Sequence, residues 1–255
     1  MMRGLTGKVA LVTGAGQGIG AAIAARLASE GCVIAVNSLH PEKAEATATR
    51  LRENQVRAEA FPADVADPDA VDAMVRAVEE RLGVVNILVN NAAVLEMAPF
   101  VDLDLGVWDR TIAVNLTGPF LCTRRVVSGM LDAQWGRIVN MSSIWGVIGA
   151  RGATAYCAAK GGLIEMTRAL GAELGPGGVA VTAVAPGVID TPQLAADAGF
   201  AGVTLDEMKA LYAEDTVVGR IGTTAEIAHA VAFLASEDGM GLCGQVLPVT
   251  GGRSE

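Results

Sequence analysis

The chain has 255 residues, 51% of them hydrophobic, and its formal net charge at pH 7 is −9. This acidic balance disfavours nucleic acids and anionic membranes as partners. No apolar run approaches the ~20 residues that cross a bilayer, and the first residues lack the features of a signal peptide, so we expect a cytoplasmic protein. The four cysteines are far apart and there are only two histidines, which predicts neither a metal site nor a disulfide framework.

Short apolar runs, typical of buried strands, alternate along the chain with helical patterns. The expected strands are 8–13, 32–37, 56–61, 86–89, 137–141, 179–183 and 245–249. The expected helices are 18–30, one from Pro41, 67–82, 107–133, 156–174 and 223–235. This alternation predicts one domain over 1–255 with a Rossmann-type α/β fold, a doubly wound seven-stranded parallel sheet with helices on both faces. The irregular stretch 190–220, helical in pattern at 205–212, is expected to form a lid.

A glycine-rich turn joins the first strand to the first helix. Gly14, Gly18 and Gly20 are spaced to allow a tight turn and a close approach of the backbone to a pyrophosphate. The helix that follows would direct its free N–H groups at the phosphates. An ordinary tight turn explains the glycines equally well when they are taken alone. Their place between a strand and a helix favours dinucleotide binding.

Further residues follow the third and fourth strands at the edge where ligands bind to open α/β sheets. Asp64 and Val65 are placed to reach an adenine, although Asp64 taken alone also fits an ordinary helix-entry residue. Asn91 and Ala92 end the fourth strand, where small side chains leave room for a ribose or a nicotinamide.

The candidate catalytic residues lie in the second half of the chain. Tyr156 and Lys160 are four residues apart, on one face of a helix, where an ammonium group would lower the pKa of the phenol. Ser142 and Ser143 end the fifth strand, where a hydroxyl could bind a substrate oxygen or simply cap a turn. Asn115 lies inside an expected helix, where a packing hydrogen bond is an alternative to function.

Together these motifs resemble the short-chain dehydrogenase/reductase family in its single-domain form, over essentially the whole chain. The turn at 13–20, the segment 90–93 and the segment 186–191 match family motifs, with Ala93 where the family's NNAG segment has a final Gly. The resemblance implies a catalytic tetrad of Asn115, Ser143, Tyr156 and Lys160. Ser143 is chosen over Ser142 because the family's serine lies thirteen residues before the tyrosine.

The resemblance implies an NAD(P)-dependent enzyme that interconverts a carbonyl and a secondary alcohol. Tyr156 would exchange a proton with the substrate oxygen, and Ser143 would orient that oxygen. Lys160 would lower the tyrosine pKa and hold the nicotinamide ribose, and Asn115 would hold a water that links Lys160 to solvent. The implied cofactor contacts are Gly14, Gln17, Gly18, Ile19, Gly20, Asn37, Ser38, Asp64, Val65, Asn91, Ala92, Tyr156, Lys160, Pro186, Gly187, Ile189 and Thr191.

The end of the second strand bears on the choice of cofactor. Ser38 stands where NAD-selective relatives carry Asp, and neither Leu39 nor Gln17 supplies the Arg that many NADP-dependent relatives carry. The missing carboxylate favours NADP(H) over NAD(H). Asn37, Ser38 and His40 are the groups that could bind the phosphate, although His40 also fits a plain loop histidine.

The substrate is expected to be a free small molecule, namely a cyclic or hydrophobic ketone or alcohol. Relatives that reduce 3-oxoacyl groups dock an acidic carrier protein on basic residues, and the positions that match here are not basic, namely Ser128, Asp132, Ala133, Gln134 and Ala172. A carrier-protein partner is therefore disfavoured. Beside Ser143 and Tyr156, an apolar pocket could be lined by Trp145, Leu194 and Phe200, which ordinary lid packing explains equally well.

Two alternatives stay open beside this interpretation. One is the 3-oxoacyl-(acyl carrier protein) reductase of fatty-acid type, and the other is a catalytically silent NAD(P)-binding regulator. The resemblance also implies a homotetramer or a dimer.

Overall fold

The computed structural model describes residues 2–252, except the side chains of residues 196, 197, 200 and 201. Within this range seven strands form one parallel sheet in the order β3-β2-β1-β4-β5-β6-β9. Their bounds are β1 (Val9–Val12), β2 (Val33–Val36), β3 (Ala58–Ala60), β4 (Val85–Asn90), β5 (Gly136–Met141), β6 (Val179–Pro186) and β9 (Val246–Val249). The predicted Rossmann-type sheet is therefore confirmed.

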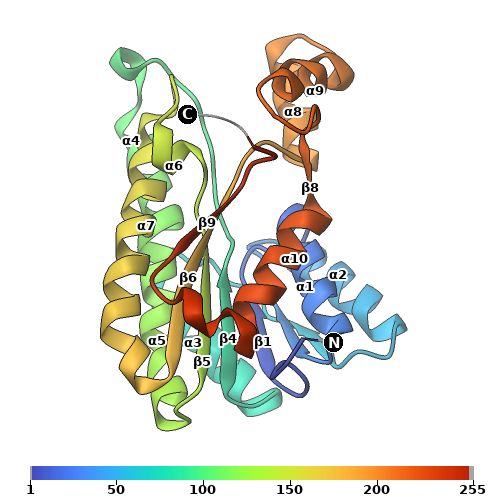
Figure 1. Cartoon of the computed structure of the whole chain (residues 1–255), viewed down its shortest axis with the longest axis vertical. Helices are drawn as coiled ribbons and strands as arrows, with labels where there is room; N and C mark the ends of the chain where they lie inside the picture. Colours follow the sequence, from blue (N-terminus) through green and yellow to red (C-terminus); the bar gives the residue numbers. More distant parts are fainter. Residues whose placement is uncertain (1, 253–255) are drawn as a thin grey trace.

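Helices cover both faces of the sheet (Figure 1). One layer holds α1 (Gly18–Ser29), α2 (Pro41–Glu53) and α10 (Thr224–Ala235), and the other holds α3 (Pro68–Arg81), α5 (Gly118–Asp132) and α7 (Thr154–Leu174). Neighbouring strand residues enter opposite cores: Val12 packs with the first layer and Leu11 with the second. Because both faces are covered, the strands are apolar on both sides, as the sequence predicts.

Side-chain caps mark the predicted starts of two helices. Asp67 accepts hydrogen bonds from the backbone N–H groups of Asp69 and Ala70 at the start of α3. Thr223 and Glu226 form the predicted capping box of α10, in which each side chain accepts from the other residue's backbone N–H.

The expected continuous helix 107–133 is wrong in its middle. The chain forms α4 (Leu105–Ile112), a π-helical turn η2 (Ala113–Thr117) and then α5. A π turn inserts an extra residue into the hydrogen-bonding pattern, and such turns are frequent at functional sites. Asn115 lies within it.

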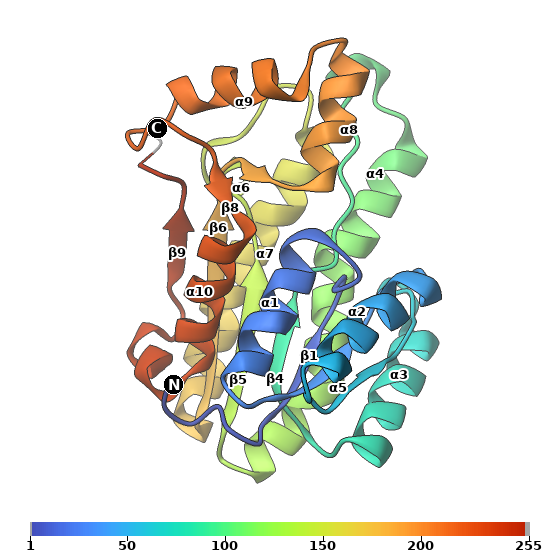
Figure 2. The same cartoon turned by 90° about the vertical axis from the view of Figure 1, so that its right-hand side faces the viewer.

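The region 189–223 stands over the carboxyl ends of the strands (Figure 2). It begins with β7 (Ile189–Asp190), forms α8 (Pro192–Ala201) and α9 (Leu205–Glu214), and returns through β8 (Gly222–Thr223), which pairs with β7. We call α8 and α9 with their connections the α8–α9 segment. A small core of Leu194, Met208 and Ile221 holds it together. The helical pattern at 205–212 predicts α9, whereas α8 and the β7–β8 ladder were not anticipated.

The remaining elements are short: η1 (Phe100–Asp102), α6 (Trp145–Ile148), η3 (Gly175–Gly177) and η4 (Glu237–Leu242). No helix in the described part of the chain has the length and apolar character needed to cross a membrane.

Candidate active site

A cavity of about 590 Å³ lies at the carboxyl ends of the strands, where the strand order reverses between β1 and β4. Ligands of open α/β sheets bind at this place. The cavity wall brings together nearly all the residues that the sequence predicts for the site, namely Gly14, Gln17, Gly18, Ile19, Gly20, Asn37, Ser38, Asp64, Val65, Asn91, Ala92, Ser143, Trp145, Tyr156, Lys160, Pro186, Gly187, Ile189, Thr191 and Leu194. Asn115 lies behind the wall. Phe200 lies outside the described side chains.

The glycine turn excludes side chains by its backbone angles at Gly14 and Gly18 and by lack of space at Gly14 and Gly20. Gly14 and Gly18 have φ angles of +63° and +57°, which L residues rarely adopt. A Cβ atom at Gly14 would lie 2.7 Å from Cα of Ala92, and one at Gly20 would lie 2.4 Å from the carbonyl oxygen of Gly14. Gln17 precedes α1 without a side-chain cap, so the first N–H groups of the helix remain for a ligand. This geometry fits the pyrophosphate of a dinucleotide.

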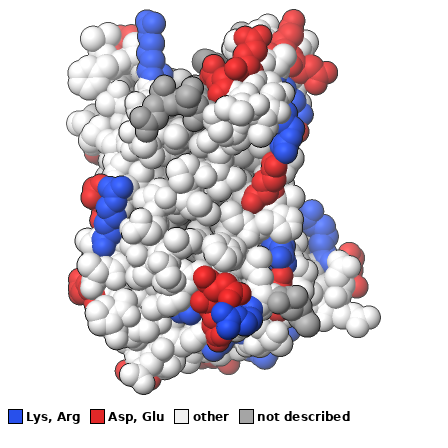
Figure 3. Space-filling model, viewed as in Figure 1, with Lys and Arg blue, Asp and Glu red and all other residues white. Residues whose placement is uncertain are grey.

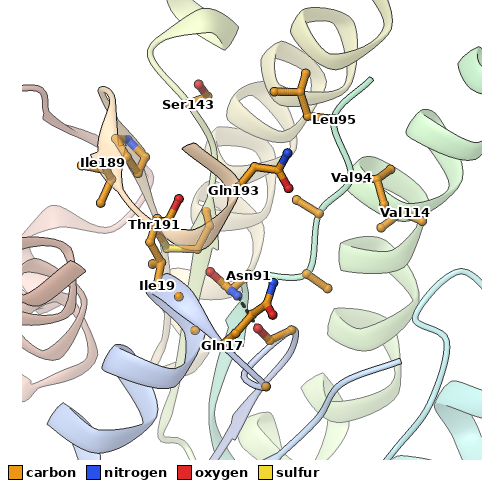
Figure 4. Close-up of a pocket in the computed structure, with 18 of the residues that line it drawn as sticks. Gln17, Ile19, Asn91, Val94, Leu95, Val114, Ser143, Ile189, Thr191 and Gln193 are labelled. Atoms are coloured by element: carbon orange, nitrogen blue, oxygen red, sulfur yellow. Dashed lines mark hydrogen bonds between the residues drawn. The ribbon is translucent and has the colours of Figure 1, made fainter. Parts of the chain in front are cut away.

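Two asparagines that line the cavity fix the turn with their side-chain amides. Asn91 donates from Nδ2 to the carbonyl oxygens of Thr13 and Gly14, at 2.9 and 3.2 Å (Figure 4). Asn37 is 1% exposed, accepts from the Gly14 N–H at 3.3 Å and donates to the carbonyl oxygen of Phe61 at 3.0 Å. The amide of Asn37 is therefore already bonded to the protein, and its binding to a phosphate stays a prediction.

At the end of β3, Asp64 is held by a partner that the sequence analysis missed. Its carboxylate accepts from the Ala66 N–H at 2.9 Å and pairs with Arg110 of α4 at 2.9 Å. Burial would raise the pKa of Asp64, but these two contacts outweigh burial and hold the pKa below its ordinary value. Arg110 also lines the cavity. It is 46 residues from Asp64, and nothing in the sequence links the two.

Lys43 is a second missed residue. It lies in the first turn of α2, lines the cavity, and donates from Nζ to Oε1 of Gln17 at 3.1 Å. A Cβ atom at Gly16 would lie 2.8 Å from the Lys43 Cβ and 2.9 Å from the Ser38 hydroxyl, so both side chains border the turn. A sequence signal for this residue exists, because Lys43 is a cation three residues past His40, just after the end of β2.

The adjacent serines have different surroundings. Ser142 is buried and donates its hydroxyl to the carbonyl oxygen of Lys160 at 2.9 Å. Ser143 lines the cavity (Figure 4). It accepts from the Trp145 N–H at 3.1 Å and hydrogen-bonds to Tyr156. The Tyr156 ring packs edge-on to Trp145, with ring centroids 6.2 Å apart. Serine, tyrosine and tryptophan thus share one wall.

Lys160 is buried on the same face of α7 as Tyr156. It is 1% exposed, and its ammonium donates to the carbonyl oxygen of Met141 at 2.7 Å. Burial lowers the pKa of Lys160 to about 8. Its Nζ atom is 5.5 Å from the centroid of the Tyr156 ring.

The expectation that Lys160 lowers the pKa of Tyr156 does not hold in this structure. Burial raises the pKa of Tyr156 to about 12, and the hydrogen bond to Ser143 opposes that rise only in part. The ammonium of Lys160 is bonded to Met141, over the ring rather than at the phenol oxygen. The tyrosine is therefore a neutral phenol at ordinary pH.

Asn115 supports the cavity wall from behind. Fully buried in the π turn, its side chain accepts from the Val94 N–H and donates to the Val94 carbonyl oxygen, each at 2.8 Å. Val94 lines the cavity, so this pair of bonds fixes the wall after β4. These hydrogen bonds agree with the alternative that Asn115 serves packing. Their partner is the loop after β4, not a neighbouring helix.

Comparison with known proteins agrees with this geometry. A sequence model of the short chain dehydrogenase family matches residues 8–198. The chain is 42% identical to D-threitol dehydrogenase of Mycolicibacterium smegmatis, over 97% of this chain and 93% of the relative. It is 37% identical to the 3-oxoacyl-(acyl-carrier-protein) reductase FabG of Aquifex aeolicus, over 97% and 98%. The chain therefore belongs to the short-chain dehydrogenase family, and we conclude that it is an oxidoreductase.

The fold has a close structural counterpart. The crystal structure of a putative gluconate dehydrogenase from Agrobacterium tumefaciens superimposes with a TM-score of 0.91 at 31% identity, covering 97% of this chain and 96% of the other. Members of this family use NAD(P) cofactors, which agrees with the fit of the glycine turn to a pyrophosphate.

Proposed function

We propose that the chain is an NADP(H)-dependent oxidoreductase that interconverts a ketone and a secondary alcohol on a free small molecule, with Tyr156 as the acid and base. The observation that carries the proposal is the shared wall of Ser143, Tyr156 and Lys160 beside a dinucleotide-shaped cradle. A bound nicotinamide would supply or accept the hydride.

Each candidate catalytic side chain has its own role in the transfer of a proton to the substrate oxygen. Ser143 holds the substrate oxygen, and the neutral phenol of Tyr156 donates its proton to that oxygen during reduction. Lys160 stays charged below its pKa of about 8, and we assign its ammonium to hold the ribose of the nicotinamide rather than to lower the pKa of Tyr156. The side chain of Asn115 is bonded to Val94, so a relay water at this residue would bind a backbone group of the π turn.

Lys43 supports the preference for NADP(H). Lys43, Ser38 and Gln17 border the glycine turn at the end of β2, where no carboxylate follows the strand. A 2′-phosphate there would meet an ammonium and a hydroxyl, and phosphate–ammonium hydrogen bonds are among the strong ones. We therefore assign the Lys43 ammonium as the cation that would bind a 2′-phosphate.

Charge supports a free substrate over a carrier protein. Acidic side chains gather over α9 at the top right of Figure 3, among them Asp206, Glu207 and Glu214. An acidic carrier protein would be repelled by this surface. The likeness to the Aquifex reductase keeps 3-oxoacyl-carrier-protein reduction as the second candidate. We also propose that the α8–α9 segment acts as the lid, and that exposed apolar residues such as Phe100, Val101 and Leu105 contribute to a homotetramer or dimer.

The test is a titration of the purified protein with NADPH and with NADH, followed by nucleotide fluorescence, beside turnover of cyclic, aromatic and acyl-thioester ketones. We expect NADPH to bind more tightly, and Lys43→Met to remove that preference without changing NADH binding. Lys8→Met, at the opposite end of the sheet, is the matched control. No binding of either nucleotide would refute the proposal, and turnover of acyl thioesters alone would favour the second candidate.

A further inference from the structure

We propose that Thr167 is a positioning residue, which holds α7 against β5 through Asn140 and so keeps Tyr156 and Lys160 in place at the cavity. The inference rests on the proposed function, because it concerns the helix that carries these two side chains. Thr167 lies seven residues after Lys160 and is fully buried. It is not among the residues predicted from the sequence.

A chain of buried polar side chains runs from β4 through β5 to α7. Asn90 and Asn140 are paired neighbours in the sheet, and Asn90 donates from Nδ2 to Oδ1 of Asn140 at 2.8 Å and to the Thr123 hydroxyl at 3.2 Å. Asn140 donates in turn from Nδ2 to the Thr167 hydroxyl oxygen at 2.9 Å. All four side chains are buried, so little water competes for these hydrogen bonds.

The direction of the bond between β5 and α7 is fixed. The Thr167 hydroxyl donates its hydrogen to the carbonyl oxygen of Leu163, one turn earlier in α7, at 2.8 Å. Its oxygen therefore serves as the acceptor, and the Asn140 amide is the donor that fills this place. A buried amide N–H without a partner is costly. The helix is therefore held at the position along β5 where Thr167 meets Asn140.

The two residues after Asn140 hold α7 at the level of Lys160. Met141 accepts the Lys160 ammonium on its carbonyl oxygen at 2.7 Å, and Ser142 donates its hydroxyl to the Lys160 carbonyl oxygen at 2.9 Å. Seven residues make almost two helical turns, so Thr167 and Lys160 point the same way from positions about 10 Å apart along the axis. Two attachments on one side of a helix fix both its height and its rotation.

The position of α7 in turn sets the place of Tyr156. At Lys160 the helix packs closely on α6, because a Cβ atom at Gly146 would lie 2.8 Å from the Lys160 carbonyl carbon. One turn earlier, Tyr156 packs edge-on to Trp145 and hydrogen-bonds to Ser143. A shift of α7 therefore moves the phenol relative to the serine. Misplacement of reacting groups by about 1 Å can cost roughly 100-fold in rate.

The experiment compares Thr167→Val, which keeps the shape and removes the hydroxyl, with Thr167→Ser, which keeps the hydroxyl. The matched control is Thr182→Val, because Thr182 of β6 is 1% exposed and its hydroxyl has no hydrogen-bond partner among the described residues. The measured quantity is kcat for ketone reduction with NADPH, under conditions where circular dichroism shows each variant to be folded.

We expect Thr167→Val to lower kcat by roughly 10-fold or more, whereas Thr167→Ser and Thr182→Val change it by less than about twofold. The affinity for NADPH should change less than kcat, because the glycine turn lies between β1 and α1. A residue that only stabilises the fold would lower the unfolding free energy and leave kcat of the folded enzyme unchanged.

Two results would overturn the inference. One is a Thr167→Val enzyme that is less stable but keeps kcat, and the other is a loss of kcat in Thr167→Ser equal to that in Thr167→Val. If Thr167→Val does not fold, Ser142→Ala tests the attachment at Lys160 through the same comparison of kcat with NADPH affinity. An unchanged kcat in Ser142→Ala would then overturn the inference.

If no ketone is turned over, the proposed function fails, and the protonation of Lys160 tests its positioning separately. Burial lowers the pKa of Lys160 to about 8, so the unfolding free energy relative to a matched Lys160→Met variant should rise from pH 7 to 9.5. A smaller rise with Thr167→Val than with Thr182→Val would keep the inference, because a loosened α7 buries Lys160 less. An equal rise in both proteins, or no rise in either, would overturn it.

Discussion

Replacement of the buried Lys160 by methionine should remove activity and change how stability depends on pH. Methionine keeps the length and apolar stem of lysine and removes the charge. In the wild type Lys160 is 1% exposed, and burial lowers its pKa from 10.5 to about 8. At about 1.4 kcal/mol per pH unit, holding this group charged in the folded protein costs about 3 kcal/mol.

The direction in which stability changes with pH follows from the number of protons that the folded and unfolded chains bind. Below pH 8 both the folded and unfolded chains hold the proton, so the full cost is present. Between pH 8 and 10.5 the unfolded chain holds a proton that the folded chain has lost, and stability rises with pH. From pH 7 to 9.5 the wild type should therefore gain about 2 kcal/mol of unfolding free energy relative to Lys160→Met.

The assay is urea unfolding of both proteins, followed by circular dichroism, at half-unit steps across this pH range. All other titrating groups are shared, so the difference between the two unfolding free energies isolates Lys160. Lys8→Met controls for the loss of one positive charge. A difference that stays constant from pH 7 to 9.5 would show that the pKa of Lys160 is not lowered and would refute the reasoning.

Three further outcomes are expected. Tyr156→Phe should lower kcat by roughly 10²–10⁴-fold with unchanged NADPH affinity, because it removes only the proton donor; similar losses in kcat and affinity would contradict that role. The rate of alcohol oxidation should increase with pH up to the Tyr156 pKa of about 12, because oxidation needs the phenolate form of Tyr156. The rate of ketone reduction should not depend on the ionisation of Tyr156 near neutral pH. Steady-state assays in both directions measure the two rates. Asn115→Leu should lower the unfolding free energy by about 2 kcal/mol, because the Val94 N–H and carbonyl lose their partners; chemical denaturation measures it, and an unchanged midpoint would count against the assignment.

The sequence was sufficient for features that local patterns control. The alternation of apolar strands and helices predicts the sheet, and Asp67 and Thr223 mark helix starts because capping depends on neighbours within three residues. Residues that act over long separations were missed. Arg110 meets Asp64 across 46 residues of sequence, and Asn115 bonds to Val94, twenty-one residues earlier, so both contacts exist only in the folded chain.

For two residues, the chemical type of the side chain did not predict which groups it bonds to in the folded protein. Asn37 has the right groups to bind a phosphate, but burial commits its amide to the turn that precedes α1. Lys160 has the charge to lower the pKa of its neighbour, but its contact with Met141 directs the ammonium elsewhere. In both cases the residue was located correctly and its bonding partners were not, because partners depend on the folded backbone.

The short β7–β8 ladder has a consequence for how the enzyme can diversify. Ile189 pairs with Gly222 and Asp190 with Thr223 in a separate two-stranded sheet, so the α8–α9 segment begins and ends at one place. The entropic cost of closing such a loop grows slowly with its length. Insertions, deletions or exchanges between residues 191 and 221 can therefore change the substrate wall while the nucleotide cradle stays intact. Because the ladder joins the two ends of this segment, the segment can be exchanged as a unit. New substrate specificities can then arise while the nucleotide-binding part of the fold is unchanged.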